Sequence, residues 1–149
     1  MKLYLDTSSL VKLFIAETGS EAVRELVTKT DTVCTSPVAY AEARATFARL
    51  RRAGQLDASA FASAKREFEA CWPTYLTVNV TDSLCREAGE LAEQFGLRGF
   101  DGIHLASFAQ VAREAGIEET SFSSFDDRLN EAARRLRRIL ARRGRGRPI

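Results

Sequence analysis

The sequence lacks the features that mark several large classes of protein. It has only three cysteines, Cys34, Cys71 and Cys85, an odd number at wide separations. This pattern fits neither a disulfide framework nor a zinc site, and it favours a reducing cytoplasm. No apolar run approaches the roughly 18 residues needed to cross a bilayer, and the N-terminus has no basic segment followed by an apolar stretch. We therefore expect a cytoplasmic protein without a membrane partner.

A strong excess of charge is also lacking, but the charge that is present is unevenly distributed. The formal net charge is +2, whereas residues 134–149 alone carry eight arginines and no acidic residue. The rest of the chain is therefore acidic. We expect a single domain over 1–141 and a basic, disordered tail over 142–149. A contact between this tail and nucleic acid or an acidic partner is the alternative interpretation.

Short apolar runs alternate along the chain with longer helical patterns. Strands are expected at 2–6, 32–35, 76–80 and 119–125. Helices are expected at 8–16, 19–29, 37–53, 57–71, 83–95, 100–115 and 127–141. This order predicts a three-layer α/β/α sandwich around a mainly parallel sheet of four to five strands. In such sheets, ligands bind beyond the carboxyl ends of the strands.

Acidic residues follow strands or begin helices in this predicted fold. Asp6 ends the first strand, where capping of the next helix is the simpler interpretation. Glu42 lies among small apolar residues of a long helix, where a local ion pair would explain it. Asp101 begins a helix, where an aspartate often only complements the helix dipole. Asp126 follows the last strand, and Asp127 competes with it, because one of the two is expected to cap the last helix.

Taken together, these carboxylates would meet in one acidic pocket at the edge of the predicted sheet. Carboxylates a few ångströms apart resist joint ionisation unless cations lie among them. Oxygen ligands select hard ions such as Mg²⁺, with Mn²⁺ as a second possibility. Such ions can activate a water molecule and neutralise a phosphate under attack. The pattern therefore favours metal-dependent chemistry on a phosphate ester.

Four segments, in order from residue 2 to about residue 130, carry a resemblance to a known family: LYLDTSSLVKLF, SPVAYAEARATFARL, FDGIHLASFA and SFSSFDDRL. They resemble the signature segments of PIN-domain ribonucleases, specifically the VapC toxins of type II toxin–antitoxin systems. The resemblance implies a PIN-like fold and a metal-dependent endoribonuclease that hydrolyses RNA phosphodiester bonds. It also implies a VapB-like antitoxin and a homodimer as partners.

The resemblance also carries site residues over to this chain. The family's catalytic, metal-binding acids correspond to Asp6, Glu42, Asp101 and Asp126, with Asp127 as a competitor for the fourth place. The supporting hydroxyl of the family corresponds to Thr7 or Ser8. On this basis we expect Asp6 and Asp101 to hold Mg²⁺ directly, and the other two acids to complete its shell directly or through water.

Two other classes of function compete with the nuclease. A phosphatase would need an aspartate two residues after Asp6, but position 8 is a serine, and the acidic pair and lysine of a receiver domain are not evident. A non-catalytic binding module, whose acidic pocket takes an arginine from a partner, stays open. Loss of RNA cleavage in EDTA and its recovery with Mg²⁺ or Mn²⁺ would separate the enzyme from the module.

The remaining candidate residues have simpler explanations. His104, the only histidine, shares a helix face with Asp101, and we expect a packed or supporting role rather than a catalytic base. The aromatic residues at 61, 68, 72 and 75 could stack RNA bases, but their spacing favours the core or a dimer contact. Basic residues could steer RNA or simply be solvated, namely Lys12, Arg44, Arg49, Arg51, Arg52 and Arg98.

Overall fold

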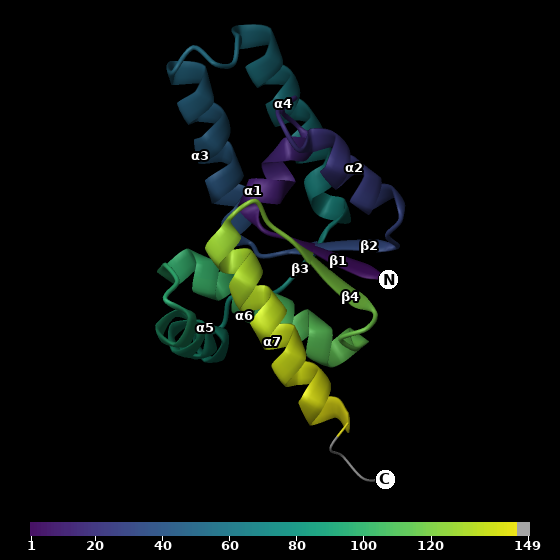
Figure 1. Ribbon diagram of the computed structural model, residues 1–149. Coiled ribbons are helices and arrows are strands. Elements are labelled where there is room, and N and C mark those ends of the chain that lie inside the picture. The colour runs from purple at the N-terminus through teal and green to yellow at the C-terminus, as the bar shows by residue number, and fades with distance from the viewer. Residues whose placement is uncertain (146–149) are drawn as a thin grey trace.

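A parallel sheet forms the middle layer of the molecule (Figure 1). The structure is a computed structural model and describes residues 1–145. Within these residues the sheet has four strands in the order β3-β2-β1-β4. They are β1 (Lys2–Leu5), β2 (Thr32–Thr35), β3 (Leu76–Thr77) and β4 (Thr120–Ser123). Because β1 pairs in parallel with both β2 and β4, it is a central strand, and the residue that follows it emerges in the middle of the sheet edge.

Helices cover both faces of this sheet (Figure 1). They are α1 (Thr7–Leu10), α2 (Ser20–Thr28), α3 (Val38–Arg52), α4 (Ala58–Cys71), α5 (Asp82–Phe95), α6 (Gly99–Ala115) and α7 (Asp127–Arg145). Helices α1 to α4 lie on one side of the strands, and α5 to α7 lie on the other. The predicted three-layer α/β/α architecture is therefore confirmed.

Strand β1 separates two apolar cores because successive side chains of a strand point to opposite faces. Leu3 and Leu5 pack into the core formed with α1 to α4. Tyr4 packs into the core formed with α5 to α7, where its ring stacks on Phe122 at a centroid distance of 5.8 Å. All three β1 side chains are buried, so the strand is a rigid support for whatever follows it.

Several element boundaries differ from the expected ones. The first helix ends early, because α1 passes into a 3₁₀ turn over Val11–Leu13. Strand β3 is a short edge strand, since the chain leaves the sheet toward the next helix after Val78 has donated to the carbonyl of Thr35. That helix, α5, is capped by Thr81, whose hydroxyl accepts from the amide of Leu84 at 3.1 Å.

The last helix is longer than expected, which corrects one prediction about the tail. Helix α7 continues through 142–145, where the sequence analysis expected disorder. Buried Leu129, Ala132 and Leu136 hold its first turns against the core. The rest of the predicted tail, 146–149, lies outside the described residues. Over 1–145, every helix is too short or too polar to cross a membrane.

Candidate active site

The four acidic residues singled out in the sequence line one cavity of about 530 Å³. Asp6 follows β1, Glu42 lies on α3, Asp101 lies in the first turn of α6, and Asp126 lies between β4 and α7. The carboxyl ends of parallel strands meet at the same edge of a sheet, so side chains far apart in the chain come together there. The four carboxylates therefore converge on one cavity, as expected from the sequence.

Asp6 is both a helix cap and a wall of the cavity. Its Oδ1 accepts from the amide of Ser9 at 3.0 Å and from the hydroxyl of Ser8 at 2.7 Å. Its Oδ2 accepts from the hydroxyl of Ser124 at 2.6 Å. The residue is only 4% exposed. Burial raises the pKa of Asp6 above its ordinary value, although the donors from Ser124 and Ser8 oppose that rise. The carboxylate is therefore fixed in orientation but costly to keep charged.

Ser124 is a residue of the site that the sequence analysis missed. While it donates to Asp6, its hydroxyl oxygen accepts from the amide of Asp126 at 3.0 Å. Ser8 acts in a similar way, because its oxygen accepts from the amide of Phe125 at 2.8 Å. These two hydroxyls tie the segment after β1 to the segment after β4. The only signal in the sequence was the pair of serines before the last acidic residues.

Glu42 is held by two donors on one of its oxygens. The hydroxyl of Thr7 donates to Oε1 at 2.7 Å, and Nε2 of His104 lies 3.0 Å from the same atom. Burial pushes the pKa of Glu42 up, but the hydrogen bonds from His104 and Thr7 outweigh burial and bring the pKa below its ordinary value. Glu42 therefore stays ionised, and its other oxygen, Oε2, is not used by these donors.

His104 is a packed, supporting residue, as the sequence analysis expected. It is 2% exposed, and its Nδ1 lies 3.0 Å from the hydroxyl of Tyr4. A carboxylate can only accept, so the Nε2 atom that faces Glu42 carries the proton. In the neutral ring Nδ1 then accepts from Tyr4. Burial raises the pKa of Tyr4 well above its usual value, which keeps this donor protonated. Glu42 therefore fixes which ring nitrogen carries the proton, and the Tyr4 hydroxyl supports the opposite nitrogen from the core.

Asp101 is paired with an arginine from the loop that precedes its own helix. Nε of Arg98 donates to Oδ2 of Asp101 at 3.0 Å, and Nη2 of Arg98 lies 4.0 Å from Oδ2 of Asp126. The Arg98 side chain is 82% exposed. An ion pair this exposed is screened by solvent and contributes little to stability. The guanidinium partly neutralises the acidic cavity and is free to exchange for another cation.

Asp126 and Asp127 have different positions. Asp126 lines the cavity and also caps α7, because its Oδ1 accepts from the amide of Leu129 at 2.8 Å. Asp127 is exposed and lies in the first turn of α7, beside an adjoining hollow. The sequence analysis expected one of the two aspartates to cap this helix, and Asp126 does so. The capping residue is the same one that faces the cavity.

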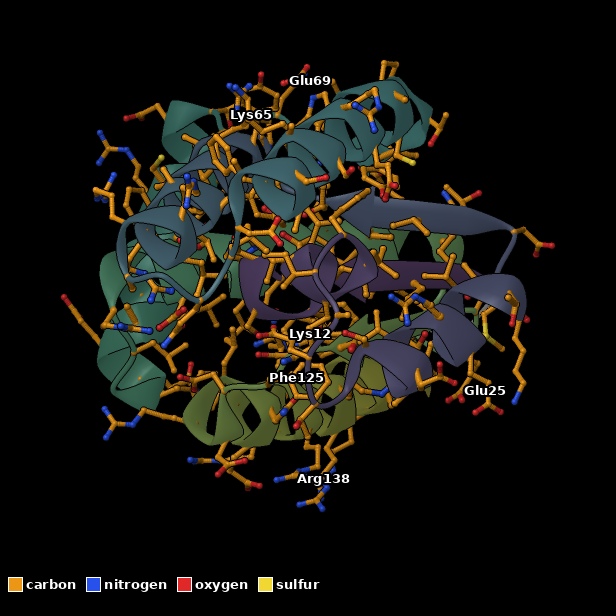
Figure 2. The ribbon with its side chains drawn as sticks, turned by 90° about the horizontal axis from the view of Figure 1, so that it is seen from above. Lys12, Glu25, Lys65, Glu69, Phe125 and Arg138 are labelled. Carbon is orange, nitrogen blue, oxygen red and sulfur yellow. The ribbon has the colours of Figure 1, made fainter. Side chains whose placement is uncertain are left out.

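Three basic residues line the cavity, and they differ in availability. Lys12 is engaged, since its Nζ lies 2.9 Å from Oε1 of Glu17 and 4.4 Å from the ring centre of Phe125. Figure 2 shows Lys12 and Phe125 close to each other. Arg49 and Arg98 are exposed at the mouth.

The other candidate arginines do not belong to the cavity. Arg44 pairs with Glu69 on α4, Arg51 donates to the carbonyl of Leu56, and Arg52 is exposed away from the cavity lining. The candidate aromatic residues also lie elsewhere. Phe68 is fully buried, and its three companions pack against the same core. The core interpretation of their spacing is therefore confirmed. The companions are Phe61, Trp72 and Tyr75.

The donor atoms around this cavity suit a hard cation, because they are carboxylate and hydroxyl oxygens. Over residues 1–145, no group of three or more His, Cys, Asp or Glu side chains is placed so that it could hold a metal ion by itself. An ion such as Mg²⁺ does not need such a group. It commonly binds through one or two carboxylates and completes its coordination with water and substrate phosphates. The cavity therefore fits a hydrated divalent ion.

Comparisons with known proteins identify the family of this chain. The PIN domain family model matches residues 3–135. Two relatives from Mycobacterium tuberculosis are Ribonuclease VapC45 (strain CDC 1551 / Oshkosh) and Ribonuclease VapC49 (strain ATCC 25618 / H37Rv). Each is 39% identical over 109 residues, which is 73% of this chain and 76% of the relative.

A solved structure shares the fold. The crystal structure of PAE2754 from Pyrobaculum aerophilum matches with a TM-score of 0.62 and 18% identity, over 95% of this chain and 96% of that one. Together with the match to the family model and the two relatives, this likeness confirms the resemblance noted in the sequence. The chain belongs to the PIN-domain family, in its VapC ribonuclease branch.

Proposed function

We propose that this protein is the toxin of a type II toxin–antitoxin pair and hydrolyses RNA phosphodiester bonds with the help of Mg²⁺. The two mycobacterial relatives are named ribonucleases, and this chain shares their family. The observation that carries the proposal is the convergence of Asp6, Glu42, Asp101 and Asp126 on one cavity. Four carboxylates at one site are costly unless a cation joins them. A divalent ion and the phosphate that it attracts would resolve that cost.

The acids would share the work of holding the ion according to how each is fixed. Asp6 is oriented by three donors, so it offers a preset ligand direction. Asp101 can offer a carboxylate when Arg98 releases it. Glu42 and Asp126 would act on the ion directly or through water molecules. When bound, Mg²⁺ or Mn²⁺ supplies neutralisation of phosphate charge and activation of a water nucleophile.

The chain's own residues would position the other reactants. Arg49 and Arg98 stand at the mouth of the cavity, where a guanidinium can bind a phosphate oxygen through two parallel hydrogen bonds. Glu42 keeps its negative charge because Thr7 and His104 donate to it. It can therefore accept a hydrogen bond from the attacking water. The buried ring of His104 supports this carboxylate and does not need to move a proton itself.

The proposed partners follow from the same family. A VapB-like antitoxin would silence the enzyme by placing a basic side chain among the acids. The pairing of Arg98 with Asp101 favours this mode, because it is an example of a guanidinium held at the cavity. A homodimer stays a prediction, which light scattering of the purified protein would test. The family assignment leaves no support for a phosphatase or a receiver domain.

The decisive experiment compares RNA cleavage by the purified protein with cleavage by the Asp6→Asn and Asp101→Asn variants. We expect cleavage with Mg²⁺ or Mn²⁺, no cleavage in EDTA, and a loss of at least ~100-fold in both variants, since even supporting residues of metal sites cost up to ~100-fold. Circular dichroism would show that both variants keep the fold. Full activity in both folded variants would contradict the proposed site.

A further inference from the structure

A second hollow opens beside the acidic cavity, between α5 and α6. We call it the α5–α6 groove. Its apolar lining is formed by Cys85, Ala88 and Gly89 of α5 and by Phe100 and Ile103 of α6. Its volume is about 570 Å³, which is large enough for a small planar ring system with its substituents. Phe100 is 58% exposed, so a large aromatic side chain stands open to solvent here.

The groove is continuous with the proposed active site. Glu42, Arg98 and Asp101 line both the groove and the acidic cavity. Phe100 immediately precedes Asp101 at the start of α6. The part of a bound RNA strand next to a phosphate at the acids would therefore lie at the groove. At that junction stands Arg98, an exposed cation suited to a phosphate.

Gly89 lines the groove, and no neighbouring atom requires a glycine at this position. It lies inside α5, where glycine is less favourable than alanine. A Cβ atom at Gly89 would meet nothing within 4 Å. Gly102 gives the contrast, because a Cβ there would lie 2.6 Å from the carbonyl oxygen of Ala88. Close packing of α6 on α5 requires Gly102, whereas Gly89 is exposed and lines the groove.

We infer that the α5–α6 groove receives an unpaired nucleobase of the RNA substrate, stacked on Phe100, while the adjoining phosphate lies at Arg98 and the acids. An exposed ring and an apolar floor suit the base of a nucleotide, and a cation on the shared wall suits its phosphate. Aromatic side chains bind the faces of unstacked bases without reading a particular sequence. The inference rests on the proposed function and narrows its substrate to single-stranded RNA segments.

A peptide of a protein partner is the competing occupant, and Arg98 is the charged lining residue that favours a phosphate over it. Arg98 is exposed and would face an anion, and the floor at Gly89 is also exposed. A base is flat and fits such a floor. The experiment below separates the two occupants.

The three cysteines provide a built-in probe of the groove. Cys85 is exposed and lines it, Cys71 is half-buried and lines a different hollow, and Cys34 is buried. The rate of maleimide labelling at each thiol would be followed by mass spectrometry in the full-length Asp6→Asn protein with Mg²⁺. A short unstructured RNA should slow labelling of Cys85 and leave Cys71 unchanged. The same RNA annealed into a duplex should protect neither thiol, because its bases are paired.

Two sets of variants test the stacking and the floor. On the same background, Phe100→Ala should raise the Kd for the unstructured RNA about 10-fold, as expected for the loss of one aromatic stack, while Phe100→Tyr should restore binding. Gly89→Ala should raise the Kd for this RNA, and Gly89→Leu should raise it further, because leucine fills more of the groove. Gly89→Ala should nevertheless leave the Tm unchanged or higher, since alanine favours the helix. Leu26→Ala, an exposed apolar residue on α2, is the matched control and should bind RNA like its parent.

Each outcome decides the inference. Unchanged labelling of Cys85 at saturating single-stranded RNA, or parental Kd values in both Phe100→Ala and Gly89→Leu, would overturn it. Protection of Cys85 by the antitoxin's peptide but not by RNA would assign the groove to the protein partner instead. Cleavage by the unsubstituted protein distinguishes failure of the groove inference from failure of the proposed function. If it cleaves RNA while Cys85 stays unprotected, only the groove inference fails, and if it does not cleave, the proposed function fails with it.

Discussion

Nε2 of His104 faces Oε1 of Glu42 at 3.0 Å, so a buried ring contacts a carboxylate that lines the acidic cavity. The hydroxyl of Tyr4, 3.0 Å from Nδ1, completes a chain of contacts from the core beneath the sheet to the acidic cavity. Because a carboxylate only accepts, Nε2 carries the proton toward Glu42, and the tyrosine hydroxyl supports the opposite ring nitrogen. The orientation of Glu42 thus depends on a residue of β1 that does not line the cavity.

Tyr4→Phe should therefore weaken catalysis without touching the cavity. Without the tyrosine hydroxyl, Nδ1 of His104 loses its hydrogen-bond partner, so the ring is held less firmly against Glu42. We expect kcat/KM for RNA to fall about 10-fold, at the lower end of losses seen for supporting residues of metal sites. The stability cost should be about 1 kcal/mol, as for one lost hydrogen bond. Tyr75→Phe is the matched control, and an equal effect of both substitutions on kcat/KM would argue against this contact chain.

The neighbouring aspartates form a second matched pair. Asp126→Asn should lower kcat/KM at least ~10-fold, because this carboxylate lines the cavity. Its fold should persist, since asparagine caps helices about as well as aspartate. Asp127→Asn should stay within about 2-fold of the unsubstituted protein, as exposed positions usually do. The reverse ranking in a cleavage assay would move the fourth acid to Asp127.

Arg98 should have opposite effects on metal and on RNA. Removing its guanidinium frees Asp101, so Arg98→Ala should bind Mn²⁺ up to about 5-fold more tightly by calorimetry, the limit for an exposed pair. The same variant should bind RNA less tightly, and the dependence of its log K on log salt should be shallower by about one unit. Arg98→Lys should restore the salt dependence. Weaker metal binding by Arg98→Ala would show that the arginine supports the ion instead of competing with it.

Asp6 predicts a pH dependence of stability in the metal-free protein. Burial raises its pKa in the fold, so the folded protein holds this proton more tightly than the unfolded chain does. Stability therefore falls as the pH rises from the ordinary carboxyl range through the raised pKa, and the full cost is present above it. In EDTA, Asp6→Asn should melt at a higher temperature than its parent at neutral pH. The advantage should shrink in acid, and a difference in Tm that does not change with pH would refute this explanation.

A bound divalent ion should offset part of the destabilisation that the buried charge of Asp6 causes in the metal-free protein. At about 100 times its Kd, an ion that binds only the folded state adds about 2.7 kcal/mol to the free energy of unfolding. We expect Mg²⁺ or Mn²⁺ to raise the Tm of the unsubstituted protein in a concentration-dependent way, and to have little effect on Asp101→Asn. Thermal melts with and without EDTA measure this directly. Equal shifts in both proteins would place the ion elsewhere.

The sequence was sufficient for the three layers and for the cavity's acids, because both follow from local patterns. Alternating apolar runs predict parallel strands, and acids at strand ends and helix starts then share an edge. The support of Glu42 and the α5–α6 groove were not predictable in the same way. They depend on which atoms meet between distant elements, such as the close approach of Gly102 to Ala88. Periodicity within one helix carries no information about such a contact.

The length of α7 and the position of Phe100 show the same limit. Arginines predict a solvated tail, yet buried Leu129 and Leu136 begin a helix that continues to Arg145. Phe100 is apolar but exposed, because its place in the first turn of α6 turns it away from both cores. Composition predicts burial on average and does not identify such exceptions.

The hydrogen bond from Ser124 to Asp6 joins residues from opposite ends of the domain. Closing so long a loop is slow and unfavourable until the strands between have paired. A nascent chain therefore has no assembled cavity until the segment after β4 has emerged and β4 has docked beside β1. Fragments that end before this segment lack Ser124 and the acid beside it. During synthesis, β4 and the segment that follows it must therefore dock before the chain has a cavity that could cleave RNA.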